Sequence, residues 1–430
     1  MTLSIIVTIL SILGMLILLL FIPKMTIHGH SFSTFYLAPL LGLIILLVSG
    51  VLPFNEFYSG LTKDSKMNPL EILVLFFSMT FISSVLDKLN FFSYLANKMV
   101  LKAKNSQKSL FFFLYGLCGF LTMFTSNDIV IITFTPFILF FAKDTKINPI
   151  PYLFCEFVAA NTWSMLFIFG NPTNVYLAST FNVDFISYFL KMALPTLFAS
   201  LTSLFIMYLL FFKMLKEKLN TEVNNETIKD KPIFIISLSI LIIVIILMAI
   251  SSYLNLPMWL FAGVGGIILF LIILISSIIK KEKPTLLFNS LKGLPFTLAP
   301  FLLSMFGIVM SLSLTGISEK FVTILLKFDQ VWSYGISSFI FSNIINNLPM
   351  SVFFSDLLVL GKANELSLYA VIISSNLGAI LTPLGALAGM MWMSILKEHN
   401  VSFSYGKFCL YGSIISIPTF LMALVPLFLF

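Results

Sequence analysis

The stretch Thr125-Ser126-Asn127-Asp128 interrupts an apolar run, and a similar interruption, Ser342-Asn343, returns 216 residues after Asn127. Each is followed by a second polar pair, Ala160-Asn161 in the first case and Ser375-Asn376 in the second. Asn161 and Asn376 are 215 residues apart, which is half of the 430-residue chain. An asparagine in hydrocarbon is costly unless something binds it, so this doubled set predicts two repeats with a shared site between them.

The composition predicts a membrane protein. The chain is 59% apolar and 10% charged, with a mean hydropathy of +1.05. Apolar runs of about 20 residues, the length that a helix needs to cross a bilayer, recur from end to end. We therefore expect an all-α, multi-pass protein of the plasma membrane with no soluble domain. A β-barrel would show short alternating strands instead.

The hydropathy pattern divides the chain into repeat 1 (residues 1–212), a polar linker (213–231) and repeat 2 (232–430). Each repeat is expected to contain three spans, an amphipathic segment, a re-entrant hairpin, a helix broken at a proline and a final span. In repeat 1 these are 2–23, 33–52, 70–87, 88–108, 109–142, 150–180 and 185–212. In repeat 2 they are 233–252, 257–279, 295–315, 317–328, 331–360, 367–397 and 408–429.

Five crossings per repeat would place the second repeat upside down relative to the first, which is the inverted-repeat plan of many secondary transporters. The lysines agree with this arrangement. Six lie on one predicted side, and the remaining 19 of the 25 lie on the other, which should be cytoplasmic. Both termini are then expected outside.

The hairpin tips and helix breaks are candidate binding elements. At these points, backbone groups lose their helical partners, so half-helix N-termini suit an anion and free carbonyl or amide oxygens suit a small cation. The alternative is that these polar side chains only cap helices or join them. The candidate residues for substrate or ion binding are Ser126, Asn127, Asp128, Asn161, Asn171, Thr173, Asn174, Ser342, Asn343, Asn346, Asn347, Asn376 and Thr382.

Two acids are candidates for coupling. Asp128 lies at the first hairpin tip and Glu156 in the helix that follows, whereas the second tip carries only amides. An acid at bilayer depth is a functional hypothesis by default. Asp128 is expected to carry a proton or, with Ser126 and Asn127, to bind sodium, and its alternative role is to cap the second arm of the hairpin. Asp356, near the outer end of the second hairpin, is expected to be a solvated or capping acid.

The sequence also argues against several functions. Arginine is absent, so no guanidinium fork is present to grip an anion. Phosphate loops and nucleotide fingerprints are absent as well, so any ATP drive would have to come from a separate ATPase subunit. The three histidines fall in predicted loops, which disfavours an intramembrane enzyme. We expect no cofactor and no nucleic-acid partner.

Three motifs resemble those of the arsenite-efflux permeases, which belong to the ion transporter superfamily and have a citrate-transporter-like domain. The motifs are Phe124–Asp128 with Thr135-Pro136, Ser342–Pro349, and Ser375–Gly389, and the resemblance extends over essentially the whole chain. It implies a scaffold domain that usually forms a homodimer. It also implies a transport domain that holds both hairpins and both broken helices and moves like an elevator.

The Ser-Asn pairs are also similar to the Ser-Asn-Thr motifs of sodium-coupled dicarboxylate carriers, where they bind sodium and carboxylate. Here the third residue is Asp128 or Ile344, which favours proton coupling. The break Gly170-Asn171-Pro172-Thr173-Asn174 departs from the pattern of the arsenite permeases.

The leading hypothesis is a secondary transporter of a small oxyanion or its neutral acid, with arsenite or antimonite efflux as the best single guess. The alternative within transport is sodium- or proton-coupled uptake of a carboxylate or a sulfate-like anion. A channel is the alternative from another class, because broken helices also build filters.

Overall fold

The structure, a computed structural model, describes residues 2–22, 24–27, 30–62, 69–102, 106–216, 227–251, 253–399 and 401–429. Nearly all of these residues are helical, so the predicted all-α membrane fold is confirmed. In the described residues, the strands form one antiparallel hairpin, β1 (Lys24–Ile27) and β2 (His30–Ser33).

The described residues of the first half form ten α-helices and one short 3₁₀ turn. They are α1 (Thr2–Phe21), α2 (Leu37–Val48), α3 (Phe54–Thr62), α4 (Pro69–Lys88), α5 (Phe91–Lys102), α6 (Gln107–Phe124), α7 (Asn127–Thr145), α8 (Ile150–Trp163), η1 (Ile168–Gly170), α9 (Pro172–Thr180) and α10 (Phe185–Phe211).

In the described residues, the α-helices of the second half follow the same order, without an equivalent of β1–β2. It contains α11 (Lys231–Ala249), α12 (Met258–Ile279), α13 (Thr285–Lys292), α14 (Leu298–Leu314), α15 (Ile317–Leu325), α16 (Gln330–Ile345), α17 (Asn347–Leu360), α18 (Glu365–Leu377), η2 (Gly378–Ile380), η3 (Pro383–Gly385), α19 (Leu387–Glu398), α20 (Tyr405–Leu424) and η4 (Val425–Leu429). Each helix from α1 to α10 thus has a counterpart ten helices later.

Six of the described helices are long and apolar enough to cross a membrane, by length and composition: α4, α6, α10, α11, α12 and α20. A seventh candidate is the pair α14 and α15, which is bent by 81°. The other apolar stretches do not form single membrane-spanning helices, because caps and breaks divide them into shorter ones. The sequence indicates that both hairpin arms are too short to cross, but α6 has 18 residues and reaches spanning length.

Contacts between the halves are reciprocal. The helix α2 packs against α14, and its counterpart α12 packs against α4. In the same way, α7 packs against α19 and α17 packs against α9, while α10 and α20 pack against each other. Such exchanged pairs are what two halves related by an approximate two-fold axis would make.

Three elements were missing from the sequence prediction: β1–β2, α3 and α13. The two short helices occupy matched places, because Phe57 of α3 packs on Phe306 of α14 and Ser84 of α4 bonds to the Ser290 carbonyl of α13. The span predicted for 33–52 is also too long, since α2 has only 12 residues.

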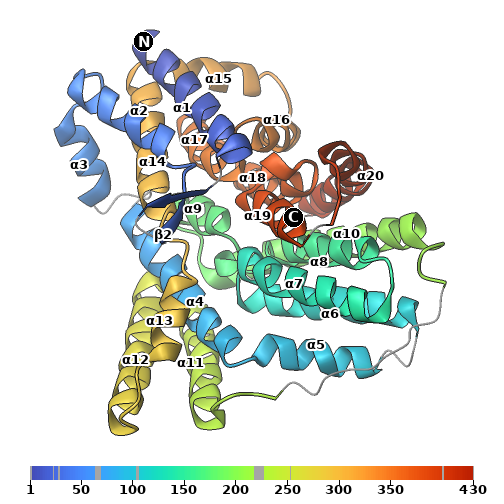
Figure 1. The fold of residues 1–430 in the computed structure, drawn as a ribbon. Helices are drawn as coiled ribbons and strands as arrows, with labels where there is room; N and C mark the ends of the chain where they lie inside the picture. The colour runs from blue at the N-terminus through green and yellow to red at the C-terminus, as the bar shows by residue number, and fades with distance from the viewer. Residues whose placement is uncertain are drawn as a thin grey trace.

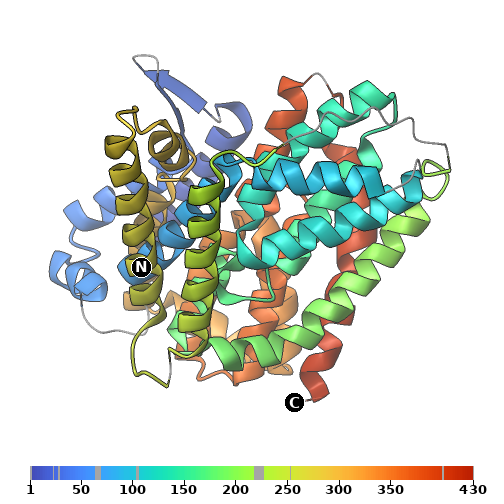
Figure 2. The ribbon, with the colours of Figure 1, turned by 90° about the horizontal axis from the view of Figure 1, so that it is seen from below.

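The helices form two groups. The flanking group consists of α1–α4 and α11–α14, and the hairpin group consists of α6–α10 and α16–α20. Figure 1 shows α1–α3 and α11–α13 along the left side of the molecule, with α6, α7, α8, α10 and α20 on the right. Seen from below in Figure 2, α11 and α12 again lie to the left of α5 and α6.

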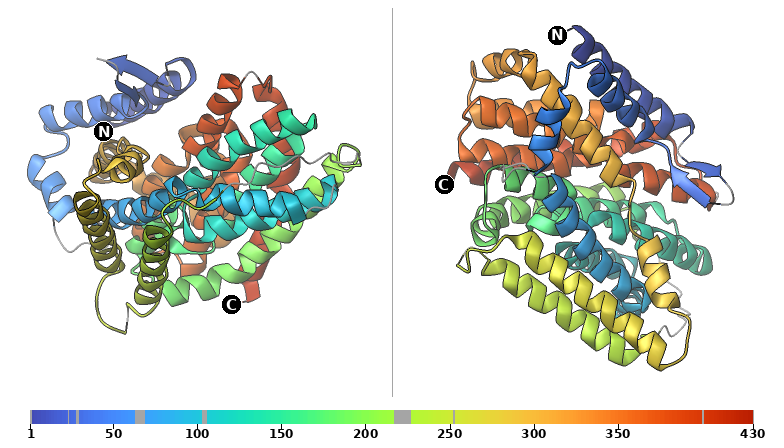
Figure 3. Two further views of the ribbon diagram at one scale, coloured as in Figure 1. Left: turned by 60° about the horizontal axis from the view of Figure 1, so that its bottom comes forward. Right: turned by 90° about the vertical axis from the view of Figure 1, so that its left-hand side faces the viewer.

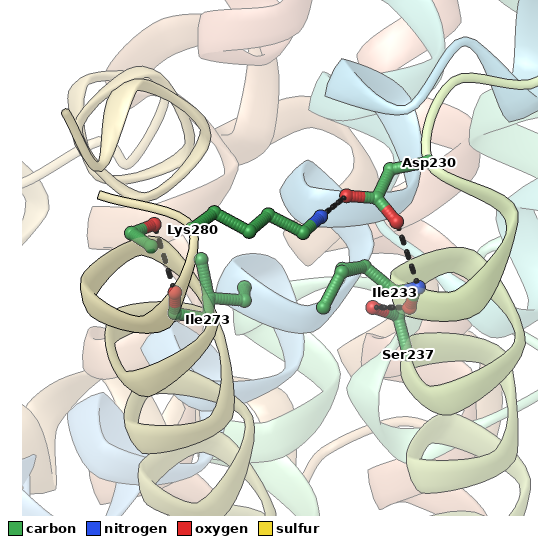
Figure 4. Close-up of polar contacts among 6 residues, drawn as sticks. Asp230, Ile233, Ser237, Ile273 and Lys280 are labelled. Atoms are coloured by element: carbon green, nitrogen blue, oxygen red, sulfur yellow. Dashed lines mark hydrogen bonds and ion pairs between the residues drawn. The ribbon is translucent and has the colours of Figure 1, made fainter. Parts of the chain in front are cut away.

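The pair α11–α12 illustrates how the flanking group is held together. The two helices run side by side, as the right panel of Figure 3 shows, and Val244 closes against Gly265, where no side chain would fit. At their ends, Lys280 donates a hydrogen bond to Asp230 at 2.6 Å, and Asp230 also caps α11 by accepting from the Ile233 amide (Figure 4).

Candidate functional site

The first hairpin tip is a two-residue break between α6 and α7. Thr125 and Ser126 are extended, and Ser126 caps α7 because its Oγ accepts from the Ile129 amide at 3.4 Å. The adjacent Asn127 is buried, and its Nδ2 donates to Asn161 Oδ1 of α8 at 3.1 Å. The first two polar pairs are therefore in direct contact.

The first helix break follows α8. The chain turns through η1, and Asn171 caps α9 by accepting from the Thr173 amide at 3.2 Å. Gly170 is required at the turn, because a Cβ there would lie 2.2 Å from the Ser164 carbonyl oxygen. The proline that follows, Pro172, occupies the first turn of α9, where its missing N–H costs nothing.

The second hairpin tip differs from the first. Asn346 has a positive φ of 73° and caps α17 by accepting from the Leu348 amide, while its Nδ2 donates to the Leu384 carbonyl at 3.0 Å. Thr382 donates to Asn343 Oδ1 at 2.8 Å. The Ser342 hydroxyl, which donates to the Phe339 carbonyl, accepts from Asn343 Nδ2 at 3.2 Å. These residues hold the second tip against the second helix break.

The two halves meet at a buried polar cluster. The amide cluster, as we call it, consists of Asn161, Ser164, Asn171, Thr173, Asn174, Ser375 and Asn376, and the exposed fraction of each is 2% or less.

Asn376 is the centre of the amide cluster. Its Oδ1 accepts from Ser164 Oγ at 2.8 Å and from Asn171 Nδ2 at 3.0 Å. Its Nδ2 donates to Asn174 Oδ1 at 2.7 Å. One side chain of the second half is thus bonded to three of the first.

Two further contacts complete the junction. The hydroxyls of Thr173 and Ser375 lie 3.0 Å apart, and Asn347 of the second tip donates to the Ser375 carbonyl at 3.1 Å. The tip residues Asn127 and Asn347 therefore attach to the amide cluster from opposite halves. Of the other second-tip residues, Asn343 and Asn346 bond to the second break, and Ser342 bonds within α16.

The contacts of the polar pairs are those of the structural alternative, and ligand binding at these residues stays a prediction. Ser126, Asn171 and Asn346 cap helices, as the structural alternative predicts, and the cluster amides bond one another. A cavity of about 10 Å³ lies beside Pro172 and Leu348, and its lining is apolar. In this conformation the amide cluster is packed by protein groups.

Asp128 is placed differently from the amides beside it. It lies in the first turn of α7 and is half-buried, and its backbone N–H bonds to Asn127 Oδ1. Within the described residues, its carboxylate makes neither a hydrogen bond nor an ion pair. A carboxylate at a helix N-terminus is stabilised by the helix dipole, and this one has its oxygens available for a cation or proton.

Glu156 is fully buried and lies away from the amide cluster. Both of its oxygens lie 3.2 Å from the Thr135 hydroxyl of α7, so it joins the second arm of the first hairpin to α8. The neighbouring residues Phe154 and Phe157 of α8 pack edge-on and tilted against Trp392. The structure therefore does not bring Glu156 together with the other candidate residues.

The sequence analysis missed three residues of the site: Ser164, Ser375 and Thr135. Ser375 was visible as the partner of Asn376 in the fourth polar pair. Ser164 follows Asn161 by one helical turn, and the position three residues on faces the same side. Thr135 gave no signal apart from its place before Pro136.

No group of three or more His, Cys, Asp or Glu side chains that could hold a metal occurs within the described ranges. Sodium, which would be cargo rather than a resident metal, was predicted at Ser126, Asn127 and Asp128. The Ser126 and Asn127 oxygens already accept backbone amides here, while the Asp128 carboxylate does not.

Known proteins that are similar in sequence are membrane transporters. The chain is 25% identical over 372 residues to the arsenical pump membrane protein of Escherichia coli, covering 82% of this chain and 84% of that one. It is 26% identical to a putative arsenical pump membrane protein of Bacillus subtilis, over 77% of this chain and 81% of the relative. It is also 23% identical to an uncharacterized transporter of Synechocystis, over 92% of this chain and 91% of the relative.

A solved structure has the same fold. The YdaH transporter of Alcanivorax borkumensis superposes with a TM-score of 0.55 at 14% identity, covering 99% of this chain and 97% of that one. A family model described as citrate transporter matches residues 16–360. With its multiple apolar helices and a match over most of its length, the chain belongs to this citrate transporter family of membrane transporters.

Proposed function

We propose that this protein is a secondary transporter that exports arsenite or antimonite, driven by protons. The observation that carries the proposal is the amide cluster, where both halves supply buried polar groups at breaks in their helices. The relatives named as arsenical pump membrane proteins support the choice of substrate, and the free carboxylate of Asp128 supports proton coupling.

The recognition chemistry is that of hydroxyls and amides. The cluster and both tips offer carbonyl and hydroxyl acceptors with amide N–H donors, and no lysine belongs to them. Such a set can replace the water around a small hydroxylated acid without a charge on either side. Substrate would replace hydrogen bonds that the amides make here, namely those of Asn376 with Asn171 and Asn174, of Asn127 with Asn161 and of Asn347 with the Ser375 carbonyl.

Movement would follow from the two groups of helices. The reciprocal contacts support two repeats (1–212 and 232–430) of opposite orientation, joined by the 213–231 linker. The hairpin group would slide against the flanking group in an elevator-like step, carrying the site from one face to the other. A homodimer formed through the flanking group, with both termini outside, stays a prediction.

The test is flux into proteoliposomes of purified protein, with pH and sodium gradients imposed separately. We expect saturable arsenite transport that follows the pH gradient and counterflow of labelled substrate. Unsaturated, ohmic current would indicate a channel instead.

A second candidate is carboxylate or sulfate uptake, because the matching family model is described as a citrate transporter. The same liposomes discriminate the two, since citrate, succinate and sulfate are offered alongside arsenite. Sodium-driven carboxylate flux without arsenite flux would replace the first proposal. Sodium would then bind at Ser126, Asn127 and Asp128.

A further inference from the structure

Two hydrogen bonds join the flanking group to the hairpin group outside the amide cluster. Thr133 Oγ1 of α7 donates to Asp87 Oδ1 of α4 at 2.9 Å. Ser313 Oγ of α14 donates to Asp356 Oδ1 of α17 at 3.1 Å. Asp356 is therefore not the solvated or capping acid that the sequence suggested.

The two bonds join corresponding helices of the two halves, α4 with α7 and α14 with α17. Asp87 is the residue before last in α4, and Ser313 is the residue before last in its counterpart α14. Thr133 and Asp356 lie on α7 and α17, the second arms of the two hairpins. Acid and hydroxyl are exchanged: the acid is on the flanking helix in the first half and on the hairpin in the second.

Both bonds are partly shielded from water. All four residues are half-buried, and Asp87 also pairs through Oδ2 with Lys88 at 2.8 Å. A hydrogen bond to a carboxylate is shorter and stronger than one between neutral groups, and it gains further when water is kept away.

We propose that Asp87–Thr133 and Ser313–Asp356 are paired clasps that hold the hairpin group in its present position and must open during transport. The inference rests on the proposed sliding of one group against the other. In halves of opposite orientation the C-terminal ends of α4 and α14 lie toward opposite membrane faces, so there is one clasp near each face. A slide in either direction separates both pairs.

The test measures the position of the hairpin group without any substrate. Spin labels are attached to the variants Tyr253→Cys, in the loop between α11 and α12, and Leu190→Cys, on α10; both sites are exposed. The half-exposed Cys409 is replaced by serine, and the buried Cys118 and Cys155 are kept. Pulsed electron paramagnetic resonance in lipid nanodiscs then gives the distribution of label-to-label distances.

Thr133→Val and Ser313→Ala remove one hydroxyl each and leave the acids in place. Each is expected to raise the population at a second distance about tenfold relative to the first, the factor for one lost hydrogen bond to a charged group. The controls are Thr122→Val and Ser237→Ala, whose hydroxyls bond at 2.7 Å to carbonyls of their own helices. They should leave the distribution of the labelled parent unchanged.

Distributions of Thr133→Val and Ser313→Ala that coincide with the parent would overturn the proposal. A single fixed distance in every variant would overturn it too, because a rigid protein has nothing for clasps to hold. Since no substrate is added, a protein that fails to transport arsenite still gives a readable answer. The experiment therefore tests the clasps independently of whether arsenite is the substrate.

Discussion

At the scale of single residues, Asp128 is the main chemical difference between the two hairpin tips. Its carboxylate is half-buried at the start of α7, while the second tip has amides in corresponding places. Asp128→Asn keeps the size of the side chain and removes its charge. We expect gradient-driven flux in proteoliposomes to fall to background while counterflow of labelled substrate persists, because exchange needs no net movement of protons.

The matched control is Asp184→Asn. Asp184 caps α10 by accepting from the Ile186 and Ser187 amides at 3.0 Å, and an asparagine oxygen does the same. Its flux should equal that of the unaltered protein. Undiminished gradient-driven flux in Asp128→Asn would remove Asp128 from the coupling mechanism.

Asn376 should matter most for the integrity of the amide cluster. Asn376→Ala leaves the side chains of Asn171 and Asn174 without their shared partner, at a cost of about 1–3 kcal/mol for each buried group left unsatisfied. Asn127→Ala breaks one bond to another side chain, that of Asn161, and one to the backbone amide of Asp128 at the start of α7. Thermal unfolding in detergent should therefore show a larger loss for Asn376→Ala; equal losses would contradict its central place.

The sequence is informative about which residues are polar and buried, and less so about their partners. The spacing shows that Asn127 and Asn161 have counterparts in Asn343 and Asn376, but it does not show which side chains bond. Asn127 bonds to Asn161. Asn343 bonds instead to Thr382, and Asn347, one turn further on, donates to the Ser375 carbonyl. The two tips also differ locally, because Asn346 has a positive φ and α17 begins at Asn347.

At the scale of elements, the two helix breaks are built on glycines 215 residues apart, Gly170 and Gly385. A Cβ would lie 2.2 Å from the Ser164 oxygen at the first and 2.7 Å from the Gly378 oxygen at the second. Either alanine variant must shift backbone rather than a flexible side chain. We expect each to lower the free energy of unfolding by about 1–3 kcal/mol, measured by thermal or denaturant unfolding in detergent.

Gly406→Ala serves as the comparison. This glycine lies in the first turn of α20, and a Cβ there would have no atom within 4 Å, so the change should be neutral or slightly stabilising. If alanine at Gly170 and Gly385 changed the free energy of unfolding no more than alanine at Gly406 does, the close backbone contacts at the two breaks would be contradicted.

The ends of α11 and α12 give a prediction about pH. The hydrogen bond from the Lys280 ammonium, together with the Ile233 amide, holds the pKa of Asp230 below its usual value (Figure 4). A carboxyl with a lowered pKa stabilises the fold at pH values above its unfolded pKa of about 4, and this contribution is lost as pH falls through the folded value. Asp230→Ala should lower the melting temperature at pH 7 by roughly 1 °C, because exposed ion pairs contribute little.

The same variant should differ less from the parent at pH 3, where the parent carboxyl is being protonated. Differential scanning fluorimetry at both pH values checks this. A difference that grows toward pH 3 has the wrong sign and would contradict the assignment.

The order of elements was predictable from hydropathy because long apolar runs, prolines and polar tips mark it directly. Helix pairs occur at the residues predicted for the hairpins, and both breaks and the amphipathic segments lie where the sequence predicts them. The re-entrant course of the hairpins stays a prediction. The helices α3 and α13 were not predicted, since each is short and amphipathic and is fixed by contacts with α14 and α4. Such pieces depend on partners distant in sequence, which a local pattern does not contain.

At the scale of the whole molecule, the exchanged contacts have a consequence for function. Because α7 packs on α19 and α17 packs on α9, each hairpin is supported by the broken helix of the other half. In the proposed movement, a displacement of one hairpin would therefore be transmitted to the opposite break. Hydropathy predicts the repeats but not this exchange, because it arises only when the halves are packed together.

Opposite orientation of the halves is the premise on which the elevator and the clasps depend, and two loops test it directly. Asn182 lies between α9 and α10, and Ser402 lies between their counterparts α19 and α20; both are exposed. Lys397 and Lys407 flank Ser402, which favours the cytoplasmic side. In a Cys409→Ser background, we expect a membrane-impermeant maleimide to label Asn182→Cys in intact cells and Ser402→Cys only after permeabilisation. Parallel repeats would place these matched loops on the same face, so labelling of both from one side would exclude the inverted arrangement and with it a clasp at each face.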